Sequence, residues 1–118
     1  MDKVKRKVLE AILGEDVGRH SVYVHNSDLH YGWFAPAQES RTINIHEFAQ
    51  KCKQWSASKG FTIVSYTLDE HNQRALIYRT DKLFENEYKY MVEPSKYDTE
   101  AEAIIRATEI IFQDLSEL

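Results

Sequence analysis

Hydrophobic residues in the last stretch of the chain recur at the three- and four-residue spacing of an amphipathic helix. Thr99 followed by Glu102 is a capping-box pattern, which predicts where this helix begins. The apolar face consists of Ala101, Ile104, Ile105, Thr108, Ile111, Phe112 and Leu115. The remaining face carries Glu100, Glu102, Glu109, Asp114 and Glu117. We therefore expect a helix with one buried face and one solvated, acidic face.

The same spacing predicts two earlier helices. In residues 2–13 an apolar stripe ends at Gly14, which can adopt the left-handed backbone conformation that terminates helices. From Asn44, which forms a second capping pattern with Glu47, another helix runs to Lys59-Gly60. Its buried stripe consists of Ile45, Phe48, Ala49, Cys52 and Trp55.

After Gly60 the hydrophobic period falls to two, which is typical of β-strands. Residues 61–68, 74–80 and 87–93 are expected to form a three-stranded meander, and residues 21–25 and 30–35 a hairpin.

The predicted fold is α+β. An α-β-β-β-α core, with a three-stranded antiparallel sheet packed on two helices, occupies residues 44–118, and an N-terminal helix and hairpin occupy residues 1–43. The pattern leaves open whether residues 1–43 extend the sheet or cover its open side.

Length and composition limit the expected number of domains, the cellular compartment and the classes of partner. A chain of 118 residues is expected to form a single domain, residues 1–118. Cys52 is the only cysteine, which excludes an intramolecular disulfide and fits a reducing compartment. The apolar run after the basic N-terminus ends by Leu13, too short for a signal sequence or a membrane span. We expect a cytosolic protein without membrane contact, and a net charge of −4 disfavours nonspecific nucleic-acid binding.

Candidate catalytic and metal-binding residues do not form a recognisable pattern. His20, His25 and His30 are evenly spaced, but a five-residue step places successive side chains on opposite sides of a strand. Cys52 lies on an apolar stripe, where burial would raise its pKa and quiet it. The glycines are scattered, so there is no phosphate-binding loop. We expect no enzyme, no cofactor and no metal site, although a cleft joining histidine and carboxylate would revive an enzymatic interpretation.

Aromatic residues are the remaining unusual feature. Cross-strand packing explains most of them, because aromatic pairs stabilise pleated surfaces. The alternative is an interface, since tyrosine and tryptophan are favoured anchors at binding surfaces. A solvent-facing row of Tyr88 and Tyr90, or of Tyr31 and Trp33, would then dock a protein partner. Our leading hypothesis is a protein-binding module that uses Trp33, Tyr88 and Tyr90.

The predicted order of elements in residues 44–117 resembles the double-stranded RNA-binding domain. Asp69 to Arg74 stand where that family carries a histidine-containing loop between its first two strands. The resemblance implies that His71 enters a minor groove of the RNA. It also implies that the first helix of the domain meets another minor groove through Lys51, Gln54 and Ser58.

The sequence departs from that family at its strongest RNA contact. A lysine cluster at the start of the family's last helix grips phosphates, whereas this chain has Thr99-Glu100-Ala101-Glu102. The proline beside the loop histidine is also absent. Glutamates repel phosphate and remove the gain from counterion release. Members without the RNA-binding face typically act as protein-interaction modules, so we expect a protein partner and keep double-stranded RNA or another nucleic acid as the alternative.

Shorter segments are similar to small proteins of phages, prophages and bacterial accessory regions that have no agreed activity. The similar segments are Lys51 to Trp55, Lys59 to Phe61 and the Thr99 to Ile105 helix start. This resemblance implies a phage or prophage setting and no particular activity.

Overall fold

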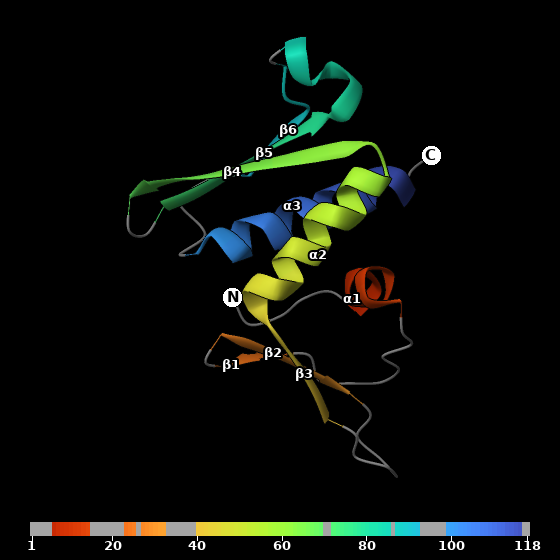
Figure 1. Cartoon of the computed structure of the whole chain (residues 1–118), viewed down its shortest axis with the longest axis vertical. Coiled ribbons are helices and arrows are strands. Elements are labelled where there is room, and N and C mark those ends of the chain that lie inside the picture. The colour runs from red at the N-terminus through yellow and green to blue at the C-terminus, as the bar shows by residue number, and fades with distance from the viewer. Residues whose placement is uncertain are drawn as a thin grey trace.

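The computed structural model describes residues 6–14, 23–25, 27–32, 40–69, 72–85, 87–92 and 99–116. Three α-helices, six strands and one 3-10 helix appear in these ranges, and the fold is α+β as the sequence predicts (Figure 1). In chain order they are α1 (Arg6–Leu13), β1 (Tyr23–His25), β2 (Asp28–Gly32), β3 (Ser40–Asn44), α2 (Ile45–Ser58), β4 (Phe61–Asp69), β5 (Asn72–Arg79), η1 (Thr80–Glu85), β6 (Tyr90–Val92) and α3 (Glu100–Ser116).

The main sheet is antiparallel, with strand order β4-β5-β6. Helices α2 and α3 pack against each other and cover one face of this sheet (Figure 1). The predicted α-β-β-β-α core is therefore confirmed. The third strand is shorter than predicted, because residues 87–89 precede β6 as irregular chain. Residues 81–85, predicted as a connection, belong to the helix η1, which also includes Thr80, the predicted end of the second strand.

The N-terminal part forms a second antiparallel sheet, with strand order β1-β2-β3. The predicted hairpin is confirmed, but its turn is shorter than expected, because His25 pairs with Asp28. Strand β3 was not predicted; it pairs with β2 and leads directly into α2. This small sheet lies on the far side of the helix layer from the main sheet (Figure 1). The described part of residues 1–43 thus neither extends the main sheet nor covers its open face.

Side chains close the N-termini of the two long helices, as the capping patterns predict. Asn44 Oδ1 accepts hydrogen bonds from the backbone N–H groups of His46 at 2.9 Å and Glu47 at 3.4 Å. Thr99 Oγ1 accepts from the backbone N–H of Glu102 at 3.2 Å. Each contact satisfies amide groups that have no partner within the helix, so the two starts are fixed locally by the sequence.

Glycines follow the ends of α1 and α2. The backbone φ angle is 68° at Gly14 and 87° at Gly60, a region that other residues adopt at a steric cost. The Gly14 N–H donates to the carbonyl of Glu10 at 2.8 Å, and the Gly60 N–H donates to the carbonyl of Ala57 at 3.1 Å. Both predicted helix ends are confirmed.

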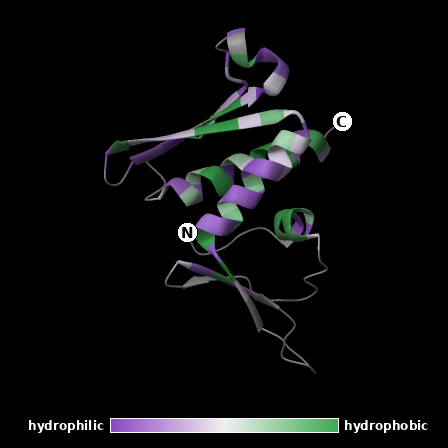
Figure 2. Ribbon diagram, in the orientation of Figure 1, coloured by the Kyte–Doolittle hydropathy of each residue, from purple (hydrophilic) through white to green (hydrophobic). Residues whose placement is uncertain are grey.

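One hydrophobic core joins both sheets through the helices. Its largest fully buried side chains include Phe48 on α2, Ile77 on β5 and Ile105 on α3. Leu9 of α1 and Leu29 of β2 belong to the same cluster. Apolar residues line α3 and the inner side of α2, and they also run along β4 (Figure 2). The small second sheet is therefore anchored to the helices by buried side chains.

The acidic face of α3 is less solvated than the sequence predicts. Glu109 is 9% exposed, because α1 packs against α3 and places Val8 beside it. Its carboxylate pairs with Arg106 Nη1 at 3.1 Å. The prediction of a solvated Glu109 was wrong, since the pattern of α3 alone does not show that a second helix covers this position.

Burial of Cys52 generates a testable prediction. Its side chain is fully buried, and desolvation raises its pKa to about 12, against a smaller opposing effect of a hydrogen bond with Thr108. Only the thiolate reacts with alkylating agents, so native Cys52 should resist iodoacetamide at pH 8 and react rapidly in urea. Mass spectrometry of the alkylated chain measures this difference. Equal rates with and without urea would contradict the buried position.

Candidate protein-interaction surface

The face of the main sheet that the helices leave open carries large apolar side chains. Residues of β4 alternate between the two faces: Phe61 and Ile63 point toward the helices and are buried, whereas Val64, Tyr66 and Leu68 point away from them. All exposed large hydrophobic side chains of the described residues belong to this side of the sheet: Val64 (39% exposed), Tyr66 (36%), Leu68 (50%), Tyr88 (50%) and Met91 (41%). We call this surface the open face.

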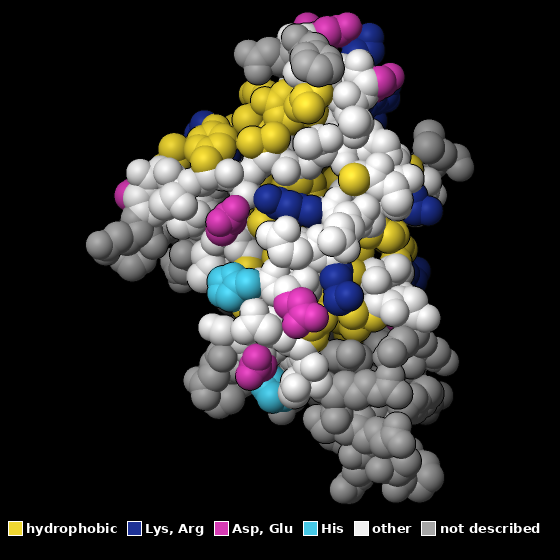
Figure 3. Space-filling model, viewed as in Figure 1, with side chains coloured by type: hydrophobic (Ala, Val, Ile, Leu, Met, Phe, Trp, Pro, Cys, Tyr) yellow, Lys and Arg dark blue, Asp and Glu magenta, His cyan; other side chains and the backbone are white. Residues whose placement is uncertain are grey.

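The centre of the open face is a row that crosses all three strands. Val64 on β4 pairs with Leu76 on β5, and Leu76 pairs with Met91 on β6. Directly opposed residues on one face of a sheet have neighbouring side chains, so these three form a continuous apolar strip. Figure 3 shows hydrophobic side chains gathered along the upper side of the main sheet, away from the helices.

Aromatic side chains flank this row on both sides along the strands. On the hairpin side, Arg74 Nη1 donates to the Tyr66 hydroxyl at 3.2 Å, and the guanidinium lies 5.8 Å from the Tyr66 ring centre. On the other side, Tyr78 and Tyr88 meet edge to face with ring centres 6.4 Å apart. These contacts orient the rings of Tyr66 and Tyr88 on the open face.

Two charged residues of the described strands lie on the open face near its hairpin end: Arg74 on β5, and Asp69 at the end of β4, which pairs with Asn72 and accepts a hydrogen bond from its Nδ2 at 2.6 Å. Arg74 forms no ion pair with the described residues, and its Nε atom is buried without a hydrogen-bond partner there. Its Nη1 already donates to the Tyr66 hydroxyl, so a carboxylate or carbonyl group of a partner would add a second contact to this cation. The open face thus combines an apolar centre with a cation and an anion at its hairpin end.

The structure separates the two tyrosines that the sequence suggested as a row. Tyr88 lies on the open face and is half exposed. Tyr90 begins β6 opposite Ile77 and packs against the core on the helix side. Its hydroxyl donates to Asp114 Oδ1 at 2.6 Å. Trp33, the third predicted anchor, and the side chain of Tyr31 lie outside the described residues.

Sequence reasoning missed Val64, Tyr66, Leu68 and Met91. A signal was present: the strand that gives β4 is apolar at even as well as odd positions. A sheet covered by helices on one side needs apolar residues only at every second position of each strand, on the covered face. Apolar residues at the other positions as well would have indicated either a second covering layer or an exposed interface.

The predicted nucleic-acid residues lie elsewhere. Lys51 and Gln54 are exposed on the outer side of α2, which is on the opposite side of the sheet from the open face. His71 lies outside the described residues. At the start of α3, Glu100 is exposed and accepts a hydrogen bond from Ser65 Oγ at 2.6 Å. The described part of this side therefore presents both signs of charge rather than a cationic groove.

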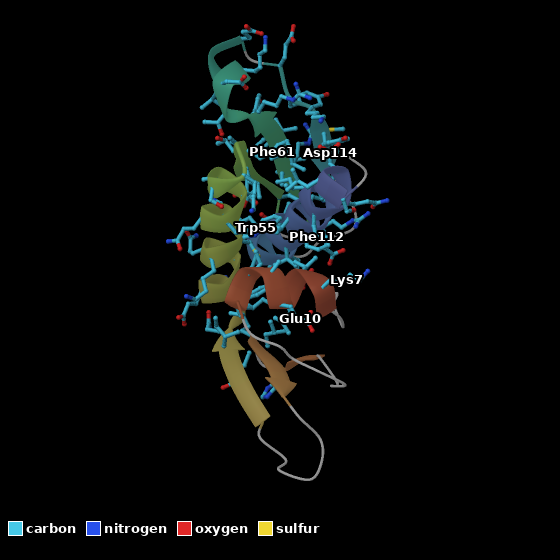
Figure 4. All side chains as sticks on the ribbon, turned by 90° about the vertical axis from the view of Figure 1, so that its right-hand side faces the viewer. Lys7, Glu10, Trp55, Phe61, Phe112 and Asp114 are labelled. Carbon is cyan, nitrogen blue, oxygen red and sulfur yellow. The ribbon has the colours of Figure 1, made fainter. Side chains whose placement is uncertain are left out.

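Two hollows open on the side of the molecule shown in Figure 4. One, of about 610 Å³, lies between α1 and α3, with Lys7 and Glu10 at its rim and Phe112 in its wall. The other, of about 640 Å³, lies at the end of the sheet beside Phe61 and Asp114.

Described lining residues of both hollows include no histidine or cysteine. The hydroxyl groups of the described lining residues bond elsewhere: Ser116 donates to the carbonyl of Gln113 at 2.9 Å, and Thr80 shares a hydrogen bond with Thr62 at 2.9 Å.

The described ranges contain no group of three or more His, Cys, Asp or Glu side chains that could hold a metal ion. His20 and the side chain of His25 are not described. None of the helices in these ranges is long and apolar enough to cross a bilayer.

Comparison of the chain with protein-family models, with curated proteins and with solved structures found no match. The resemblances to the double-stranded RNA-binding domain and to phage proteins therefore stay predictions.

The Tyr90 contact with Asp114 can be tested through pH. Hydrogen bonds from Tyr90 and then from Lys89 hold the pKa of Asp114 below its ordinary value of 3.8. A carboxyl group with a depressed pKa stabilises the fold above pH 4 and loses this effect as the pH falls through the depressed value. Tyr90→Phe should therefore lower the free energy of unfolding by about 1 kcal/mol at pH 7, and by less at pH 3.

Urea denaturation at the two pH values measures this change. Tyr88→Phe is the matched control, because no hydrogen bond of the Tyr88 hydroxyl is found in the described structure and its ring stays in place. A Tyr90→Phe variant as stable as wild type at pH 7 would show that the contact does not support the fold.

Proposed function

We propose that this protein is a cytosolic protein-binding module and that its partner docks on the open face. The observation that carries the proposal is the position of the exposed large hydrophobic side chains, which among the described residues gather on that one surface. Exposed apolar side chains scattered singly are ordinary, whereas a contiguous group is typical of an interaction site. The absence of a catalytic constellation in the described hollows also supports a binding role.

The composition of the open face supports a protein as the partner. Protein interfaces are enriched in tyrosine, methionine and arginine and depleted in lysine, aspartate and glutamate. The described strand residues of the open face follow this composition, with Tyr66, Arg74 and Met91 as the residues typical of binding anchors. A phosphate backbone would instead require several cations on one surface.

Double-stranded RNA stays the second candidate. Its support is the exposure of Lys51 and Gln54 on one side of α2, the side that the resemblance assigns to a minor groove. Glu100 and Glu102, at the start of α3, work against it, because they replace phosphate-binding cations by repelling anions. A phage or prophage origin is likewise proposed from sequence resemblance alone.

Site-specific photocrosslinking separates the two candidates. The photoreactive residue p-benzoylphenylalanine replaces Tyr88 on the open face in one variant and Gln54 on α2 in the other. After irradiation in cells that naturally express the protein, and after nuclease treatment, we expect protein adducts from position 88 and none from position 54. Nuclease-sensitive adducts from position 54 alone would reject the open face in favour of nucleic acid.

A second set of variants tests whether the apolar row supplies the binding energy. Leu68→Lys with Met91→Lys places two cations on the open face and should reduce the adduct yield from position 88 about tenfold, since losing one strong anchor costs that much or more. Lys51→Glu with Gln54→Glu is the matched control on α2 and should leave the yield unchanged. Circular dichroism confirms that each variant is folded. The proposal fails if the open-face pair has no effect.

A further inference from the structure

Strand β4 is the long edge of the main sheet, and its outer edge has no neighbour among the described strands. Its backbone groups alternate in direction, as in any antiparallel ladder. Thr80 N–H donates to the carbonyl of Gly60 at 2.9 Å, so even-numbered residues of β4 form the hydrogen-bonded pairs with β5. The backbone groups of Ile63, Ser65 and Thr67 consequently point outward, to the free edge.

The hydrogen bonds of β5 on its β6 side give the same direction for the backbone groups of Ile63. Lys89 N–H donates to the carbonyl of Ile77 at 2.7 Å, so the backbone groups of Ile77 point away from β4 toward the β6 side. Ile77 is the partner of Ile63 in the register. In a pair that does not exchange hydrogen bonds, both residues turn their backbone groups outward. Ile63 therefore presents its amide and carbonyl to the free edge.

Except near its hairpin end, the edge of β4 lacks the features that keep edge strands from pairing. Natural edges are usually short or carry lysine, proline or an inward-pointing charge. Strand β4 has nine residues, with no proline and no charged side chain from Phe61 to Leu68. Its one irregularity is a register shift between Thr67 and Asp69, close to the hairpin end. Most of the strand is thus a regular template for another strand.

We propose that the strand that pairs with this edge is β4 of a second copy, antiparallel to the first, forming a continuous six-stranded sheet. The register that uses the whole strand places Ser65 on the two-fold axis. Val64 then opposes Tyr66 of the second copy on the open side, a favourable aliphatic and aromatic pair. Because residues 61–68 are uncharged, no like charges meet across the axis.

The charges at the two ends of β4 are complementary in this arrangement. Lys59 immediately precedes the strand, and Asp69 ends it. Antiparallel pairing brings the basic end of one copy to the acidic end of the other, twice by symmetry. Both side chains are exposed, and each also has a contact within its own chain: Asp69 Oδ2 accepts a hydrogen bond from Asn72 Nδ2 at 2.6 Å, and Lys59 Nζ lies 6.0 Å from the Trp55 ring centre. A strand from an unrelated protein would need the same neutral centre and opposite ends, whereas a second copy has them by construction.

Pairing would also join the two open faces into one surface. A two-fold axis perpendicular to the sheet keeps the helices of both copies on one side and both apolar rows on the other. The inference is independent of which protein docks on the open face, because it rests on backbone groups at the edge. It adds a symmetric, doubled surface to the proposed function.

Sedimentation equilibrium of the full chain tests the pairing with two substitutions at one position. Ser65→Pro removes an outward N–H and places a ring at the edge, while the ladder with β5 keeps its hydrogen bonds. Ser65→Ala is the matched control, because it removes the same hydroxyl contact with Glu100 and keeps the N–H. We expect wild type and Ser65→Ala to dimerise in the micromolar range, and Ser65→Pro to weaken dimerisation at least tenfold with an unchanged circular dichroism spectrum.

Cysteine crosslinking tests the register without relying on proline. Opposed residues of a hydrogen-bonded antiparallel pair have Cα atoms about 5.5 Å apart, within reach of a disulfide. Ser65→Cys should therefore form a covalent dimer on mild oxidation. Thr67→Cys should not, since the two copies of position 67 would lie about 13 Å apart along the paired strands. Native Cys52 is buried and does not interfere.

The results separate this inference from the proposed function. A wild-type chain that stays monomeric up to millimolar concentration overturns the pairing, and so does a dimer that Ser65→Pro leaves intact. Crosslinking from position 88 to a different protein would still support docking on the open face in either case. Equal disulfide formation at positions 65 and 67 would overturn the proposed register.

Discussion

The packing of α3 against both α2 and the main sheet is the contact on which the rest of the structure depends. Alanine residues alternate with isoleucines on its buried side, so the helix approaches its neighbours closely while still filling the core. Phe48 of α2 and Ile77 of β5 belong to the same cluster. With both helices committed to one face of the sheet, the opposite face has no covering layer among the described elements.

This arrangement turns a sequence feature into a functional one. Strand β4 carries apolar residues at both parities, but the helices bury only one set. The other set, with Met91 of β6 and Tyr88, remains in contact with water at an unfavourable free energy, which a partner would relieve. The fold tolerates this cost because the covered side supplies a continuous core. A surface that is unfavourable in the isolated domain and well organised by its ring contacts is suited to recognition.

Polar contacts show which of the residues that the sequence suggested as surface residues have a structural role instead. Tyr90 and Lys89 both donate to Asp114 and tie β6 to the end of α3, so an aromatic residue of promising type has a structural role. Glu109, acidic by sequence, is buried beside α1 and paired with Arg106. Tyr88, close in sequence to Tyr90, lies on the opposite side of the sheet. The surroundings of each residue, rather than its residue type, decide whether it has a structural role or is available for binding.

The sequence by itself determined the elements that depend on local chemistry. Asn44 and Thr99 fix helix starts, Gly14 and Gly60 fix helix ends, and the change of period after Gly60 marks the meander. These signals act over a few residues, so they are readable without the fold. Strand β3 was not predicted, because its five residues have no strong alternation of polar and apolar side chains and owe their conformation to pairing with β2.

Only the tertiary structure decided which face of the sheet the helices cover and that the N-terminal strands form a separate sheet. It therefore also decided that Val64, Tyr66, Leu68 and Met91 share one surface. Burial and exposure depend on contacts between segments far apart in the chain, and the hydrophobic pattern of one segment does not specify which partner covers it.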